Sequence, residues 1–235
     1  MEALLALITA AAATGFCIDL VRSHRASPRP HTAAYALGIG CFALATWALF
    51  LGTATGWTSA SYRTFFLFGA IVNIPILALG SMFLVVGRRA GHTMLILLFP
   101  FFAIALPMTV AQPFDAGSLP SGGVPSGRDL WLDVFGPRLW AAIGGGMGAT
   151  ILITLALVSV FRFWRSARPV VWGNVAIVAG TLAASTGGTF LALGEAGGFA
   201  VSLLMAVTLI WLGYRIASGA RAAAPAEPTA AVSAG

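Results

Sequence analysis

Seven long apolar stretches separated by short polar gaps fill most of this 235-residue chain. A helix needs about 20 residues to cross a hydrocarbon core of roughly 30 Å. Helices are the expected form, because open strands in lipid leave backbone groups without hydrogen bonds. The pattern therefore predicts an all-α, polytopic transmembrane bundle of seven helices, over residues 3–20, 33–53, 64–86, 93–110, 139–161, 170–193 and 197–214.

The stretches define one transmembrane domain, residues 1–216. The longest connection, residues 111–137, contains several prolines and glycines, so an irregular external loop is expected there. Residues 217–235 are mostly small and carry little large apolar surface that could pack. We expect them to form a disordered cytoplasmic tail.

Arginine is distributed unequally between alternate gaps. The opposite side of the predicted membrane holds Arg63, Arg128 and Arg138. Cytoplasmic loops carry an excess of arginine, so we expect the N-terminus outside and the C-terminus in the cytoplasm. Ten of the 13 basic residues follow the first, third, fifth and seventh stretches: Arg22, Arg25, Arg29, Arg88, Arg89, Arg162, Arg165, Arg168, Arg215 and Arg221.

Composition agrees with a membrane protein and indicates its source. Hydrophobic residues make up 59% of the chain, charged residues 9%, and the chain contains no lysine. Abundant alanine and glycine without lysine are typical of a GC-rich bacterial genome, so the cytoplasmic (inner) membrane of a bacterium is expected. No basic region precedes the first stretch, which favours a retained anchor over a signal peptide.

The formal net charge of +6 comes from arginines at the ends of apolar stretches. We therefore expect anionic lipid headgroups as partners and no binding of nucleic acid. Without lysine the chain cannot form a retinal Schiff base. His24, His31 and His92 all lie in the predicted connections, and no metalloprotease, serine hydrolase or phosphate-loop motif occurs. The sequence predicts no enzyme, no cofactor and no metal site.

Asn73 and Pro75 lie near the middle of the third stretch. An amide at that depth needs a hydrogen-bond partner, and Pro75 frees a backbone carbonyl one turn earlier. The two residues are candidates for a ligand-binding notch. The alternative is structural: Asn73 bonds a neighbouring helix and Pro75 bends its own.

The sixth stretch contains three hydroxyl side chains that could line a polar path: Ser185, Thr186 and Thr189. Small residues four positions apart equally favour close contact between helices, within the chain or with a partner or second copy. The positions with this spacing are Gly144 and Gly148 in the fifth stretch and Gly180, Ala184 and Gly188 in the sixth.

Charged residues at the predicted outer boundary form another candidate ligand site: Arg63, Arg138 and Glu195. The alternative for Arg138 is contact with headgroups or an ion pair with Asp133. On the inner side, Asp19 precedes Arg22 by three residues, a spacing that predicts a pair on one helix face.

Three segments resemble a group of uncharacterised seven-helix membrane proteins of actinobacteria: residues 22–30, FGAIVNIPILALG (68–80) and GNVAIVAGTLAAS (173–185). The likeness covers nearly the whole chain and implies no known activity. The topology is more distantly similar to seven-helix input modules of bacterial sensor kinases, without a kinase domain after Arg221. It also resembles three-one-three sugar transporters, although the only Gln-Pro pair, Gln112 and Pro113, lies in the outer loop.

The expected function is binding without catalysis, of a lipid or apolar small ligand or of a partner membrane protein. The alternative is facilitative transport of a small neutral solute. Asn73, Pro75 and a weak similarity between residues 22–52 and 162–194 favour that alternative. An enzyme acting on lipid is a third hypothesis.

Overall fold

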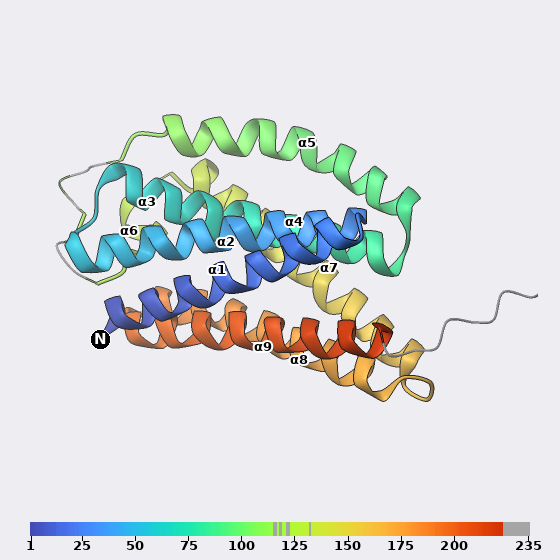
Figure 1. Ribbon diagram of the computed structural model, residues 1–235. Helices are drawn as coiled ribbons and strands as arrows, with labels where there is room; N and C mark the ends of the chain where they lie inside the picture. The colour runs from blue at the N-terminus through green and yellow to red at the C-terminus, as the bar shows by residue number, and fades with distance from the viewer. Residues whose placement is uncertain (115–116, 118, 121–122, 132, 223–235) are drawn as a thin grey trace, which may run out of the picture.

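The computed structural model is all-α and describes residues 1–114, 117, 119–120, 123–131 and 133–222 (Figure 1). Its helices are α1 (Glu2–Ala26), α2 (Pro30–Thr55), α3 (Ser59–Phe66), the π-helical turn η1 (Leu67–Val72), α4 (Asn73–Val85), α5 (Arg88–Ala111), α6 (Gly127–Leu130), η3 (Val134–Arg138), α7 (Leu139–Phe163), α8 (Arg168–Ala192) and α9 (Ala196–Ala222). Short turns join most of them, so consecutive long helices run in opposite directions.

Seven helices within the described residues are long and apolar enough to span a membrane, which confirms the predicted fold class at that level. Most of them extend beyond the predicted limits at one or both ends. The seventh spanning helix, α9, extends furthest beyond its predicted limit. It continues to Ala222 and so includes residues 217–222, which were expected to be disordered. The rest of the expected tail, 223–235, and parts of the predicted loop 111–137 lie outside the described residues.

α3, η1 and α4 form one continuous rod, Ser59–Val85, with a wide turn in its middle. Pro75 has no N–H to donate to Ile71, and its ring crowds that carbonyl, which disrupts the regular α-helical hydrogen bonding there. The π-helical turn takes up this irregularity just before Asn73. A Cβ atom built on Gly144 of α7 would lie 2.8 Å from the Ile71 carbonyl oxygen, so only glycine lets α7 approach it.

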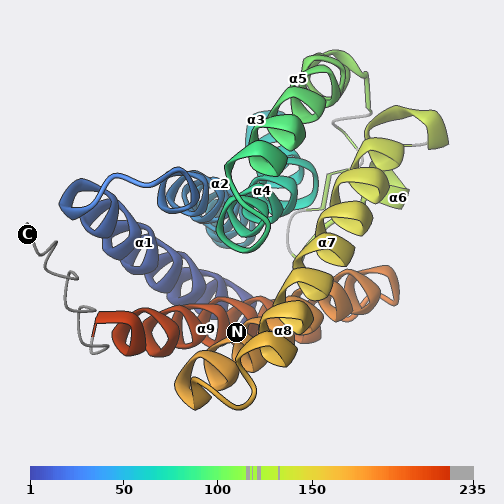
Figure 2. The same cartoon turned by 90° about the vertical axis from the view of Figure 1, so that its right-hand side faces the viewer.

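Six of the helical units close into a ring. α1 packs on α2, α2 on α4, α4 on α7, α7 on α8, α8 on α9, and α9 returns to α1. The contact between α8 and α9 is the most extensive, and the end-on view of Figure 2 shows the two side by side. The ring leaves an interior that several helices face.

α5 lies outside this ring. It packs mainly on α4 (Figure 2). In its most apolar 18-residue segment, only 11% of the residues are buried. Large apolar side chains on its free face, among them Ile96, Leu97 and Phe99, are mostly exposed. In a membrane such a face meets lipid chains, which are as apolar as leucine.

Glycines make the helix contacts that the small-residue spacing predicts. A Cβ on Gly148 would lie 2.8 Å from Ile74 Cγ2, and one on Gly180 would lie 2.9 Å from the Ala206 carbonyl oxygen. Gly188 has open space beside it. The contacts at Gly144, Gly148 and Gly180 are therefore made within the chain.

Asp19 connects α1 to α9, which closes the ring. Its Oδ2 accepts hydrogen bonds from Trp211 Nε1 and Arg215 Nη1, each at 2.9 Å. Arg22, the predicted partner, acts on Asp19 only through a weaker electrostatic interaction, and the direct hydrogen-bond partners come from a helix almost 200 positions away. Local spacing allows a pair on one helix, but the packing of α9 supplies two donors in a better position.

Candidate ligand-binding cavities

Arg63 holds the end of α5 in place. Its Nη1 donates to the Thr109 carbonyl, and its Nη2 donates to the Gln112 carbonyl at 2.9 Å. The guanidinium also lies over the rings of Phe114 and Trp131, 4.7 and 5.2 Å from their centroids. Such carbonyls at a helix C-terminus have no partner in the helix, so Arg63 satisfies them and its charge faces aromatic rings.

The other two charged candidates have different surroundings, although Arg138 shares Trp131 with Arg63. Arg138 donates from Nη1 to the Trp131 carbonyl at 3.3 Å, while Asp133 accepts from the backbone N–H of Phe135. Glu195 is exposed in the turn between α8 and α9. Among the described residues no ion pair joins Arg63, Arg138 and Glu195.

The three hydroxyl candidates of α8 are exposed on its outer side. Ser185 Oγ donates to the Thr181 carbonyl, and Thr186 Oγ1 donates to the Ala183 carbonyl. Ser185, Thr186 and Thr189 line neither of the two interior cavities described next. Threonine and serine bond their own helix in this way when no other acceptor is near.

The first cavity, here called the end cavity, lies inside the ring at the end that carries the turns between α1 and α2, α4 and α5, and α7 and α8. That end, the arginine-rich end, holds the arginines that follow the first, third and fifth stretches. The end cavity has a volume of about 320 Å³. Residues of α1, α2, α4, α7, α8 and α9 line it, so it exists only because the ring closes.

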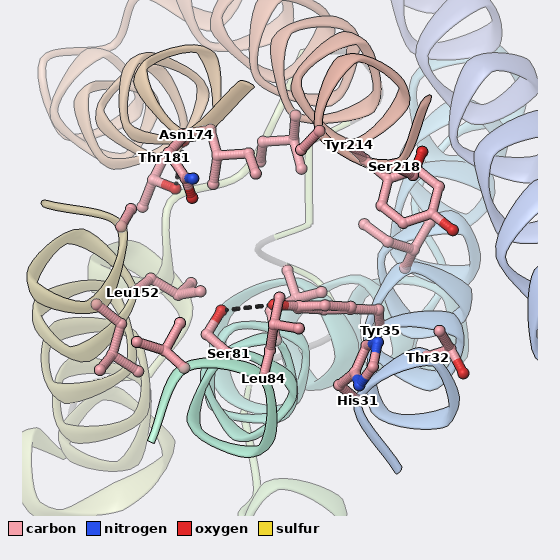
Figure 3. Close-up of a pocket in the computed structure, with 18 of the residues that line it drawn as sticks. His31, Thr32, Tyr35, Ser81, Leu84, Leu152, Asn174, Thr181, Tyr214 and Ser218 are labelled. Carbon is pink, nitrogen blue, oxygen red and sulfur yellow. Dashed lines mark hydrogen bonds between the residues drawn. The ribbon is translucent and has the colours of Figure 1, made fainter. Parts of the chain in front are cut away.

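Polar side chains face the end cavity from opposite sides (Figure 3). Tyr35 and Ser81 lie on one side, with the Tyr35 hydroxyl and Ser81 Oγ hydrogen-bonded at 2.9 Å. Asn174 and Thr181 of α8 lie across from them. Each donates to a carbonyl of its own helix, Asn174 Nδ2 to Val170 and Thr181 Oγ1 to Ile177, both at 2.8 Å. Hydroxyl and amide oxygen atoms therefore line both walls.

Most of the polar lining lies toward the arginine-rich end, together with Leu84, Val85 and Ala217, whereas the deeper lining is apolar except for Thr181. Arg29 and His31, at the turn between α1 and α2, contribute to the polar lining. Ile39, Leu77 and Leu152 contribute to the deeper, apolar lining. The end cavity is thus amphipathic along the bundle, polar at the rim and apolar toward the centre.

A second cavity of about 240 Å³, the deep cavity, continues from the first toward the opposite end. Its lining is almost wholly apolar and reaches Pro125 and Gly127 in the loop before α7. The two cavities share five lining residues: Ile39, Leu77, Leu152, Thr181 and Ile210.

Asn73 and Pro75 have different surroundings. Asn73 is 4% exposed, lines the deep cavity, and its Oδ1 is buried without a hydrogen-bond partner among the described residues. Pro75 lies on the other side of α4, where its ring packs against Gly144 and its nitrogen lies near Gly148. Of the eight sequence candidates, only Asn73 lines either of these two cavities.

Sequence reasoning did not select five polar residues of the end cavity that come from its walls: Tyr35, Ser81, Asn174, Tyr214 and Ser218. They come from four helices, and no local motif connects them. The available signal was weak: these residues lie in the halves of their helices nearest the arginine-rich turns, where polar side chains are common in any membrane protein.

No protein-family model, curated protein or solved structure matches this chain. Among the described residues, no group of three or more His, Cys, Asp or Glu side chains is placed to hold a metal ion. The cavities therefore carry the functional argument. By helix length and composition the chain is a multi-pass membrane protein, and the cavities define a bundle with a hollow, amphipathic interior.

Proposed function

We propose that this chain is a receptor-type membrane protein of a bacterial cytoplasmic membrane that binds a small amphipathic, lipid-like molecule in the end cavity. The end cavity carries this proposal, because it is enclosed by six helices, polar at its rim and apolar below. Ligand sites in helical bundles have this form, with few polar groups on a mainly apolar wall. The protein binds its ligand without chemical change.

The ligand's polar head is proposed to lie between Tyr35 and Ser81 on one wall and Asn174 on the other. Its apolar part is proposed to lie against Leu77 and Leu152. A head group placed here exchanges water for hydroxyl and amide partners, which avoids the cost of burying it unpaired.

We propose that the arginine-rich end faces the cytoplasm, with the N-terminus outside. The excess of arginine in the turns of that end supports this orientation. The end cavity then opens toward the inner leaflet and cytoplasm. Single cysteines placed at Ser166 and Ser126, in a background without Cys17 and Cys41, test this in intact cells. Labelling by a membrane-impermeant maleimide is expected at position 126 only, and labelling at position 166 alone would reverse the orientation.

Binding is tested with the purified protein in lipid nanodiscs and a photoreactive monoacylglycerol. Ala156 is buried and lines the end cavity, so Ala156→Phe is expected to fill it and to lower labelling about tenfold. Leu157→Phe is the matched control, because Leu157 is exposed on the next position of the same helix. Wild-type labelling that maps outside the end cavity, or that Ala156→Phe leaves unchanged in a protein of normal melting temperature, would overturn the proposal.

A facilitative carrier for a small neutral solute is the second candidate. The five residues shared by the two cavities favour it, because together the cavities extend from the arginine-rich end to the loop before α7. Thr181→Phe is expected to close the junction. Swelling of proteoliposomes in glycerol and in erythritol should then fall to the rate of protein-free vesicles. Wild-type protein that accelerates neither would count against a carrier.

Binding of a partner membrane protein needs a surface other than Gly144, Gly148 and Gly180, because their contacts lie within the chain. Gly188 has open space beside it but also lines the deep cavity, as Ala184 does. The exposed face of α5 offers apolar area, although lipid covers such a face equally well.

A further inference from the structure

We propose that the deep cavity is a second binding site, which takes an uncharged apolar molecule carrying a hydroxyl group and hydrogen-bonds that hydroxyl to the Asn73 amide. This goes beyond the amphipathic ligand of the end cavity, and either site can exist without the other.

The deep cavity is suited to an apolar molecule. Aromatic and aliphatic side chains surround it, including Phe42, Phe65 and Phe199. Its lining, all from described residues, contains no charged side chain. An ion placed there would lose its hydration without gaining a counter-charge, which is strongly unfavourable in a protein interior. The molecule is therefore neutral.

Among the side chains that line the deep cavity, Asn73 is the one with a buried polar atom that lacks a hydrogen-bond partner in the described chain. Thr46 Oγ1 lies 3.0 Å from the carbonyl oxygens of Phe42 and Ala43, and the Thr181 hydroxyl donates to Ile177, so both hydroxyl protons serve their own helices. Asn73 Oδ1 has no such partner in the described chain. A buried amide oxygen without a partner destabilises the folded protein, and a ligand that bonds it recovers part of that cost.

A hydroxyl fits this amide better than other neutral groups. The oxygen and nitrogen of an asparagine amide exchange places by a rotation of χ2, so a partner must serve in either orientation. A hydroxyl both donates and accepts, whereas an ether or ketone only accepts. Water meets the same requirement but needs two to four polar neighbours, and the deep cavity provides few.

The backbone fixes Asn73 at its position. The π-helical turn ends immediately before it, and Pro75 follows two residues later. Gly148 holds this segment against α7, because a Cβ there would lie only 3.0 Å from the Pro75 nitrogen. Leu77, one turn further along, lines both cavities, so Asn73 lies beside their junction. A rigidly held polar group in an apolar cavity is the arrangement that gives a site its specificity.

The test uses two probes that differ in the hydroxyl proton, which can donate to Asn73 Oδ1, and otherwise by one methyl group. One is a photoreactive C12 alcohol with a diazirine in its chain, and the other is its methyl ether. The wild-type protein in nanodiscs is expected to be labelled by the alcohol about fivefold more than by the ether, as one net hydrogen bond provides. The cross-links are expected on deep-cavity residues such as Phe65 and Leu203.

Asn73→Leu is expected to remove the preference for the alcohol while keeping or raising the melting temperature, because leucine replaces an unpartnered amide with an apolar group of similar size. A structural role for Asn73 predicts the opposite, a lower melting temperature. Ala184→Leu, which adds volume to the deep cavity, is expected to lower labelling by both probes about tenfold. Ala183→Leu is its control, because Ala183 lines neither cavity.

Equal labelling of the wild type by alcohol and ether, or cross-links that avoid the deep cavity, would overturn the second site. A preference that survives in Asn73→Leu would overturn the role of the amide. Labelling of the end cavity by the monoacylglycerol is read separately in the same samples. Loss of one site is thereby distinguished from loss of the other.

Discussion

The rod Ser59–Val85 and the neighbouring helix α5 are almost equally apolar, yet they occupy opposite environments. The most apolar 18-residue segment has a mean hydropathy of 2.1 in the rod and 2.3 in α5. Half of the residues in the rod's segment are buried, whereas only 11% of those in the segment of α5 are buried. The rod packs on α2 and α7, whereas α5 packs mainly on the rod. Hydropathy alone therefore does not separate a helix inside the bundle from one at its edge.

The difference decides which helix contributes to the candidate sites. The rod lines both cavities and carries Asn73, Leu77 and Ser81. α5, every residue of which is described, lines neither. Irregular backbone in lipid is stable only where protein or a cavity surrounds it, which is where η1 lies. Pro100 and Pro107 of α5 are accommodated within an otherwise continuous helix.

The largest expected effect tests the buried side of this comparison. Ile71 on the rod is fully buried, whereas Ile96 on α5 is 70% exposed. Ile71→Ala is expected to lower the free energy of unfolding by roughly 2–5 kcal/mol, because it leaves a cavity in the core. Ile96→Ala is expected to change it by less than about 0.5 kcal/mol. Titration with a denaturing detergent measures both, and equal effects would place α5 inside the bundle.

A smaller effect tests how α5 is attached to the rod. Arg63→Met removes two hydrogen bonds to carbonyls at the end of α5 and is expected to cost about 1.5–3 kcal/mol. Arg128 is exposed, so Arg128→Met serves as a control with a change below about 0.5 kcal/mol. Proteolysis at the end of α5 should also accelerate in Arg63→Met. A ligand role for Arg63 without a structural one predicts normal stability and normal proteolysis.

The smallest effect tests the contact between the rod and α7. Gly148→Ala is expected to cost about 1–3 kcal/mol, because the new methyl group meets backbone atoms of Ile74 and Pro75. Gly146 of the same helix has open space, so Gly146→Ala is expected to be neutral or slightly stabilising. Thermal unfolding of the two variants provides the measurement. A stable Gly148→Ala protein would mean that α7 does not approach the rod closely.

Much of the architecture could be predicted because each signal is local. An apolar stretch of sufficient length predicts a spanning helix from neighbouring residues alone, and the glycine spacing predicts close packing in the same way. The prediction missed the direct partners of Asp19 for the complementary reason. Those partners, Trp211 and Arg215, come near only when α9 packs on α1.

The candidate site could be predicted only where a single residue was unusual by itself. An asparagine in the middle of an apolar stretch is conspicuous, and Asn73 does line a cavity. Tyr35, Ser81 and Asn174 are ordinary residues near helix ends, and their common cavity depends on how the helices are arranged. Ser185 faces outward because of the rotation of α8 about its axis, which small residues on several faces leave undetermined.

By itself the sequence determined the number of helices, their approximate extent and the presence of a buried amide. Those properties follow from the cost of exposing backbone and polar groups to hydrocarbon, which acts on each segment separately. Only the tertiary structure decided which helices form the ring, which one lies outside it, and that two cavities meet beside Asn73. In lipid, helix association depends on the fit of surfaces and not on differences in hydrophobicity, so hydropathy carries little of that information.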